Sequence, residues 1–192
     1  MMDQCKELIV KEIAISTGGV EKEIETNTVT EDFPKILSRL NEIEHKLSVL
    51  RSVDSTFKVF GSEHHKYELG RTITENEIIA FEQKHRISLP FDYRSFILRF
   101  GDAACGPFYG LLTIEKGVYD LPQNIRDSDI IMLSNPFRFI SPWNRESIIG
   151  DVDFQEDEYD DVKWCDGMLR IRHAGCGQFI NIVVTGTEYG NK

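Results

Sequence analysis

The stretch TENEIIAFEQKHRISLPFDYRSFILRFG, residues 74–101, decides the fold. Its start places Thr74 three positions before Glu77, the spacing of a capping box in which each side chain binds the other residue's backbone N–H. The box predicts a helix that begins after Thr74, and Pro90 ends it because the residue before a proline favours an extended conformation. The helix residues expected on one face are Ile78, Phe81 and His85.

A second helix is predicted for PFDYRSFILRF, residues 90–100, because proline is well suited to open a helix. Gly101 follows it, at the position where a helix end favours a left-handed residue. Arg94 falls on a different face from Phe96, and we expect it to pair with an acid. The side chains predicted to line the buried side are Tyr93, Phe96, Ile97 and Phe100.

After Gly101 the sequence changes to short strand candidates. The last two are separated only by Gly175-Cys176-Gly177, which predicts a hairpin. Helices followed by strands indicate an α+β domain with a mostly antiparallel sheet and the helices packed on it. The strand candidates are YGLLTIE (109–115), FRFI (137–140), MLRIRHA (168–174) and QFINIVVTG (178–186).

The N-terminal part is organised differently. Residues 1–17 hold a short apolar run that fits a helix or a strand equally well, and residues 16–30 are rich in Gly, Thr and Glu, as in a tether. We therefore predict an arm and tether over 1–29 and a single domain over 30–192. An amphipathic helix with Thr30 as its cap is expected to open that domain. Its apolar stripe is Phe33, Leu37, Leu40, Ile43, Leu47 and Leu50.

The composition narrows the class of protein. With 192 residues, 41% of them hydrophobic and 10% aromatic, the chain can bury the core of one domain, which excludes uniform disorder. The net charge of −10 disfavours direct nucleic-acid binding and favours basic partners. No signal-peptide pattern or membrane-length apolar run occurs, and the four cysteines form no CxxC pair, so a cytoplasmic, reduced protein is expected.

These segments, in this order, resemble the SUKH superfamily over residues 60–192. That superfamily includes the Smi/Knr proteins, which are fungal regulators of cell-wall synthesis, and many bacterial antitoxins. The matching segments are the capped helix, LPFDYRSF (89–96), the turn 101–110, Pro136-Phe137 and GQFINIVVTGTEYG (177–190).

The sequence departs from the family pattern in two places. It has Asp102-Ala103-Ala104 where the family's turn reads Asn-Gly-Gly. The family also continues into a Trp-containing strand and a C-terminal helix, whereas this sequence ends at Lys192, so we expect that strand and helix to be absent.

The resemblance implies a non-enzymatic immunity protein that binds and neutralises a cognate toxin, a basic protein such as a nuclease. The alternative is a regulatory or scaffolding module of cell-wall synthesis, which the same fold would serve. No cofactor, metal or membrane partner is expected under either hypothesis.

Cys105 lies in FGDAACGPFYG, residues 100–110, and admits two interpretations. A catalytic thiol would need a neighbouring base and a lowered pKa. None of the histidines belongs to a recognisable cysteine-protease signature. We therefore interpret Cys105 as a small residue at a backbone bend, and we predict no catalytic residue.

Three residues could serve as zinc ligands because they lie within twelve residues of one another: Cys165, His173 and Cys176. A structural zinc ion needs four ligands, usually in closely spaced pairs, and Cys165 has no near partner in the sequence. His173 also falls at the end of a strand candidate. We predict no metal site here.

The most acidic segment is DVDFQEDEYDD, residues 151–161, which supplies −7 of the net charge. It begins with oxygen ligands at the spacing of a calcium loop. Glu156, however, stands in place of the turn glycine, and Val162 in place of the bidentate glutamate. We predict a solvated loop that contacts a basic partner. The candidate contact residues are Asp151, Asp153, Glu156, Asp157, Glu158, Asp160 and Asp161.

Overall fold

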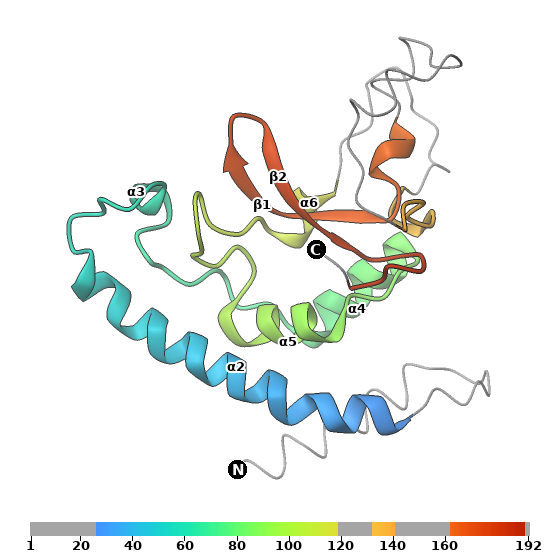
Figure 1. The fold of residues 1–192 in the computed structure, drawn as a ribbon, viewed down its shortest axis with the longest axis horizontal. Helices are drawn as coiled ribbons and strands as arrows, with labels where there is room; N and C mark the ends of the chain where they lie inside the picture. Colours follow the sequence, from blue (N-terminus) through green and yellow to red (C-terminus); the bar gives the residue numbers. More distant parts are fainter. Residues whose placement is uncertain (1–25, 119–131, 141–161, 191–192) are drawn as a thin grey trace. The chain divides into compact units, whose positions relative to one another are not determined.

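The computed structural model describes residues 26–118, 132–140 and 162–190 (Figure 1). The chain divides into two compact units, Met1–Asn41 and Glu42–Lys192, and the boundary falls within helix α2 (Thr26–Val53). The predicted arm and most of the predicted tether lie outside the described residues. Within the described part of the chain, no helix is long and apolar enough to cross a bilayer.

Helix α2 begins at Thr26, earlier than the cap predicted at Thr30. Several cap-forming residues occur in succession here, so the sequence alone could not choose among them. The predicted apolar stripe is confirmed: its six residues are buried or half-buried, while most positions between them are exposed.

In the second unit, the last turns of α2 are tied to other segments by charged side chains. The guanidinium of Arg51 donates to Glu68 Oε1 at 2.9 Å and to the carbonyl of Lys66. Arg99, on a later helix, donates to Glu44 Oε2 at 2.5 Å. These contacts attach the residues after Glu42 to the rest of that unit.

Helix α4 (Glu75–His85) has the predicted start. The Thr74 hydroxyl accepts the N–H of Glu77, and Glu77 Oε2 accepts the N–H of Thr74, which completes the capping box. The Arg71 side chain donates to Glu77 as well. The Thr74 N–H, followed by the Arg71 side chain and the Thr74 hydroxyl, lowers the pKa of Glu77 to about 2.

Helix α5 (Phe91–Phe100) has Pro90 as its N-cap and buries Tyr93, Ile97 and Phe100 as predicted. Phe96, the fourth predicted residue, is only partly buried and packs against the core. Gly101 has the expected positive φ of 92°, but its ψ of 166° is extended, so the predicted left-handed cap is wrong. Its backbone instead runs beside that of Gly70, whose carbonyl oxygen would lie 2.5 Å from a Cβ on Gly101. This close approach requires glycine.

The sheet consists of β1 (Met168–Gly175) and β2 (Gln178–Val183), paired antiparallel as predicted, with Leu169 opposite Ile182. Cys176 and Gly177 form the turn, with φ of 49° and 75°. Positive φ at both central residues is the geometry of a type I′ turn, which matches the twist of the strands that it joins.

The other two strand candidates do not form strands. Leu111 and Phe137 make single bridges to Arg172 and Gly186. Helix α6 (Ile114–Gly117) takes the end of the first candidate, because the Thr113 hydroxyl caps it by accepting the N–H of Lys116. The remaining short helices are α3 (Ser62–His65), η1 (Met132–Ser134) and η3 (Val162–Cys165).

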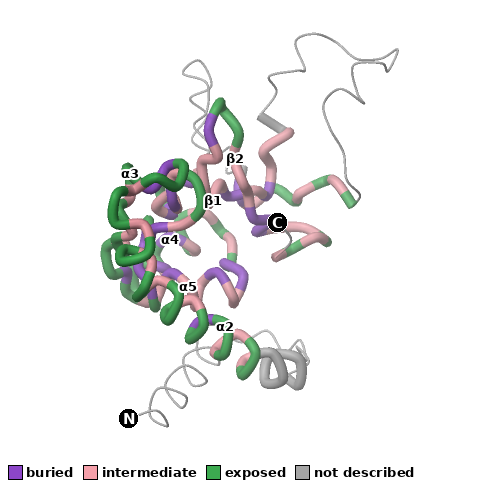
Figure 2. The backbone as a smooth tube through the Cα atoms, turned by 60° about the vertical axis from the view of Figure 1, so that its left-hand side comes forward, coloured by how far each residue is buried: buried purple, intermediate pink, exposed green. Residues whose placement is uncertain are grey.

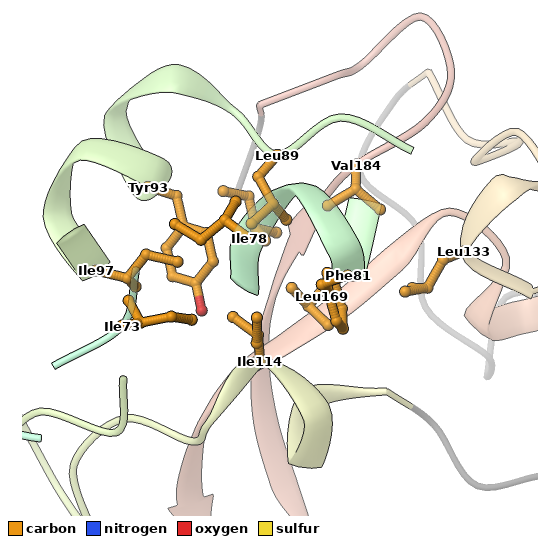
Figure 3. Packing of buried hydrophobic residues seen from close by; sticks show 11 residues of the cluster. Ile73, Ile78, Phe81, Leu89, Tyr93, Ile97, Ile114, Leu133, Leu169 and Val184 are labelled. Carbon is orange, nitrogen blue, oxygen red and sulfur yellow. The ribbon is translucent and has the colours of Figure 1, made fainter. Parts of the chain in front are cut away.

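The core lies between α4, α5 and the hairpin, so the structure is α+β as predicted. Figure 3 shows side chains from these elements and from the segments around them pointing toward one another. Fully burying each such side chain contributes about 1.5–3 kcal/mol. The cluster is Ile73, Ile78, Phe81, Leu89, Tyr93, Ile97, Ile114, Leu133, Leu169, Ile182 and Val184.

Arg94 of α5 joins the two helices through two glutamates of α4. It pairs with Glu75 and, at 2.7 Å, with Glu82 Oε2, which confirms the expected acidic partner. Glu82 Oε1 also accepts the N–H of Leu89 at 2.7 Å. One carboxylate therefore fixes both the connection between α4 and α5 and the arginine of α5.

Candidate protein-interaction surface

The acidic residues predicted to contact a partner lie outside the described residues, so the structure gives no geometry for them. They are Asp151, Asp153, Glu156, Asp157, Glu158, Asp160 and Asp161. A different surface, built from described residues, has the properties of a binding site.

This surface brings together aromatic side chains from three segments of the second unit. The ring of Tyr109 lies 5.3 Å from that of Phe60, 4.8 Å from that of His64 and 5.3 Å from that of His173. Phe60 also meets Phe108 edge to face at 6.2 Å. We call the set the aromatic surface and define it as Phe60, His64, Phe108, Tyr109, Arg172 and His173.

Both phenylalanines of the aromatic surface are exposed to solvent, although most large apolar side chains in the described part of the chain are not. Phe60 is 60% exposed and Phe108 is 40% exposed. Figure 2 shows exposed residues along the segment around α3 and at the turn between β1 and β2. Exposed aromatic rings gathered from separate segments are typical of a protein–protein contact.

Phe108 is held in an unfavourable backbone conformation. Its φ is 59°, in the left-handed region, which is a genuine outlier for a bulky residue. Such a conformation costs about 1–2 kcal/mol and persists only where the surroundings impose it. The chain tolerates this cost at a residue whose side chain is partly exposed.

Arg172 is the charged member of the surface. Its guanidinium carbon lies 5.2 Å from the centre of the Phe108 ring, a cation–π contact. Its Nε is buried and has no hydrogen-bond partner among the described residues. The planar group is therefore held in place by the ring, and no carboxylate of the described chain neutralises it.

The segment that presents Phe60 is organised by Asp54. The Asp54 carboxylate accepts the N–H of Lys58 at 2.8 Å, the N–H of Val59 at 3.1 Å and the hydroxyl of Tyr67 at 2.7 Å. These donors, the Lys58 N–H first, lower the pKa of Asp54 to about 2. The loop is thus closed by a carboxylate that stays ionised at physiological pH.

Gly61 lets this loop lie directly against the turn that carries Phe108. A Cβ on Gly61 would sit 2.0 Å from the carbonyl oxygen of Phe108, and the φ of Gly61 is 80°. Any other residue would push the two backbones apart and separate Phe60 from Tyr109.

The adjacent histidines at 64 and 65 point in different directions. His64 contacts Tyr109, whereas His65 contacts Tyr67 and its Nδ1 accepts the Tyr67 N–H at 3.1 Å. Burial is the main cause that lowers the pKa of His65. Both histidines belong to the short helix α3.

Cys105 is buried at 4% exposure, and its N–H donates to the Glu68 carbonyl at 3.0 Å. Burial raises the pKa of its thiol, whereas a nucleophilic cysteine needs the opposite shift. Cys105 is therefore a small packed residue, and the predicted bend lies just after it, at residues 107–109.

Candidate metal ligands do not gather in the part of the chain that the structure describes. Across residues 26–118, 132–140 and 162–190, no three His, Cys, Asp or Glu side chains are grouped as a metal ion would require. His173 instead lies between the rings of Tyr109 and Phe179, and Cys176 is exposed at the hairpin turn.

The sequence analysis did not identify the aromatic surface, because its members are far apart in the chain. One signal was present: Phe108 and Tyr109 stand together between Gly106-Pro107 and Gly110, and a tight turn of this kind cannot bury two rings by itself. Which segments would cover those rings was not readable from spacing.

Residues 72–191 match the model of the SMI1 / KNR4 family (SUKH-1), which confirms the predicted resemblance. The matched range includes both helices of the core, the hairpin and four members of the aromatic surface; Phe60 and His64 precede it. No curated protein and no solved structure matches the chain.

Proposed function

Because the chain belongs to the SMI1/KNR4 family (SUKH-1), which includes toxin-immunity proteins, we propose that it is an immunity protein. In this proposal it binds a cognate toxin in the cytoplasm and neutralises it without any chemistry of its own. The observation that carries the proposal is the aromatic surface.

The composition of that surface supports binding. Rings and arginines supply most of the energy in many protein interfaces, since they bury a large area at little conformational cost. Phe108 and Tyr109 are presented by a turn, and His173 and Arg172 by a strand, so the side chains are held before a partner arrives. Such preorganisation raises affinity.

The burial of Cys105 supports a non-enzymatic role, because it makes the thiol inaccessible and raises its pKa, which disfavours a nucleophile. The buried Asp102 also has a structural role, because its Oδ1 accepts the N–H of Ile114 at 2.8 Å. Both residues serve the packing of the turn after α5.

We propose further that the acids of residues 151–161 attract a basic toxin, as a nuclease would be. Opposite charge raises the association rate and favours the correct partner. The aromatic surface would then supply the short-range contact. In this proposal the acidic segment speeds association with the toxin, and the aromatic surface stabilises the complex once it has formed.

The proposal is tested by protection of cells. A toxin domain encoded beside this gene is expressed in bacteria with and without the chain, and growth is measured together with binding of the purified proteins. We expect the wild-type chain to restore growth and to bind the toxin directly. Growth arrest despite a folded, expressed chain would refute the proposal.

The variant Phe108→Asn tests whether the surface carries the binding. Asparagine adopts positive φ more readily than most residues, so the fold should be retained. We expect a loss of affinity of roughly 30-fold or more, the size of a hot-spot effect. The matched control is Ile140→Asn, because Ile140 is 76% exposed and lies outside the surface; that change should leave binding intact.

A further inference from the structure

Arg172 lacks the carboxylate partner that four other arginines of the described chain have. Its side chain has no ion pair among the described residues, and its buried Nε has no acceptor there. Four other guanidinium groups pair with glutamates. The pairs are Arg51–Glu68, Arg71–Glu77, Arg94 with Glu75 and Glu82, and Arg99–Glu44.

The charged and titratable members of the aromatic surface are basic, whereas the chain as a whole is acidic. The chain carries −10, yet the aromatic surface holds one arginine, two histidines and no acid. Glu63, the acid next to His64 in sequence, lies 3.7 Å from His64 Nε2, and its side chain is 73% exposed. Among the described residues, no carboxylate forms an ion pair with the Arg172 guanidinium.

The ring beneath the guanidinium determines what it can bind. The guanidinium carbon lies 5.2 Å from the centre of the Phe108 ring, and Nε is buried, so the two Nη groups are the donors left for hydrogen bonds. A carboxylate accepts from such a pair of N–H groups. The phenylalanines beside it offer apolar contact at the same place.

Resting on the proposed function, we propose that the aromatic surface binds a segment of the partner that carries an Asp or Glu next to an aromatic or aliphatic side chain. The carboxylate pairs with Arg172, and the apolar side chain lies against Phe60 and Phe108. The partner is thus locally acidic at this contact, even where its overall charge is basic.

The experiment selects random peptides displayed on phage against the full chain and retains those that no longer bind Phe108→Asn. We expect the retained peptides to contain an acid beside an apolar residue. Changing that acid to its amide should weaken binding about tenfold or more, and so should Arg172→Gln. Using the amide peptides tests the carboxylate without altering the protein.

The matched control is Arg138→Gln, because Arg138 also lies over a ring, that of Trp164, at 5.8 Å, but outside the aromatic surface. It should leave peptide binding unchanged. Thermal melts of both variants confirm that the fold is kept.

The inference is overturned if no peptide is retained, if the retained peptides are basic or lack an acid, or if Arg172→Gln binds them as tightly as the wild type. The outcome of the growth assay does not depend on these peptide results. Protection of cells without acid-containing peptides would reject this inference alone, and acid-containing peptides without protection would reject the proposed function.

Discussion

Glu82 is the residue whose replacement tests how α4 and α5 are held together. Its two oxygens accept the Leu89 N–H and the Arg94 Nη1, each at 2.7 Å, and its side chain is only 14% exposed. Alanine would remove the acceptor of an N–H in the buried Leu89 and one of the two carboxylates that pair with Arg94.

The expected cost follows from these two losses. A buried N–H without an acceptor costs about 1–3 kcal/mol. Breaking a buried ion pair costs about 3–5 kcal/mol, but Arg94 is 18% exposed and keeps Glu75, which reduces this share to about 1–2 kcal/mol. We expect Glu82→Ala to lower the free energy of unfolding by about 2–5 kcal/mol.

Urea-induced and thermal unfolding of the purified chain measure this change. For a protein of this size the melting temperature should fall by roughly 5–15 °C. Glu82→Gln, which keeps an oxygen for Leu89 but loses the charge, should lie between the wild type and Glu82→Ala.

The matched control is Glu75→Ala. Glu75 pairs with the same guanidinium but is 33% exposed, so its loss should cost about 1 kcal/mol or less. Equal losses at Glu75 and Glu82 would show that the Leu89 N–H does not depend on the carboxylate, and the reasoning would be wrong.

Further predictions concern a cap, a buried acid and the acidic segment. Thr74→Ala should cost about 0.5–2 kcal/mol in urea unfolding, because it removes a cap; no change would contradict the capping box. Burial raises the pKa of Asp102, so its contribution to stability is present below its unfolded pKa, near 4, and is lost as pH rises through the folded pKa. Asp102→Asn keeps the oxygen that accepts from Ile114, and its stability relative to the wild type should therefore increase from pH 4 to pH 7; a constant difference would refute this. Amide replacement of four acids should slow association with a basic toxin and reduce its salt dependence in stopped-flow measurements while the melt is kept, whereas unchanged rates would limit the segment to a solvated surface. Those four are Asp157, Glu158, Asp160 and Asp161.

The elements that the sequence predicted correctly are those defined by neighbouring residues. The capping box joins Thr74 to Glu77, Pro90 separates two helices, and Cys176 and Gly177 form a hairpin turn. In each case the interactions that favour the structure lie within a few residues, so they can be recognised by spacing. The stripe of α2 was readable for the same reason, whereas its first residue was not.

The candidate contact in residues 151–161 remains a prediction, since it rests on charge alone. Pairing partners were harder to predict than turns, because a strand candidate is completed only by a segment far away in the chain. Thus 109–115 and 137–140 have strand-like composition yet form single bridges, and Thr113 favours a helical turn instead.

The aromatic surface was decided by the tertiary structure alone. Phe60, Tyr109 and His173 belong to three segments, and nothing in their spacing requires them to meet. They meet because Asp54 closes one loop, Gly61 lets that loop approach the next, and the hairpin places its strand beside both. Local sequence determines which helices and turns can form, whereas a surface assembled from distant segments depends on how their backbones pack.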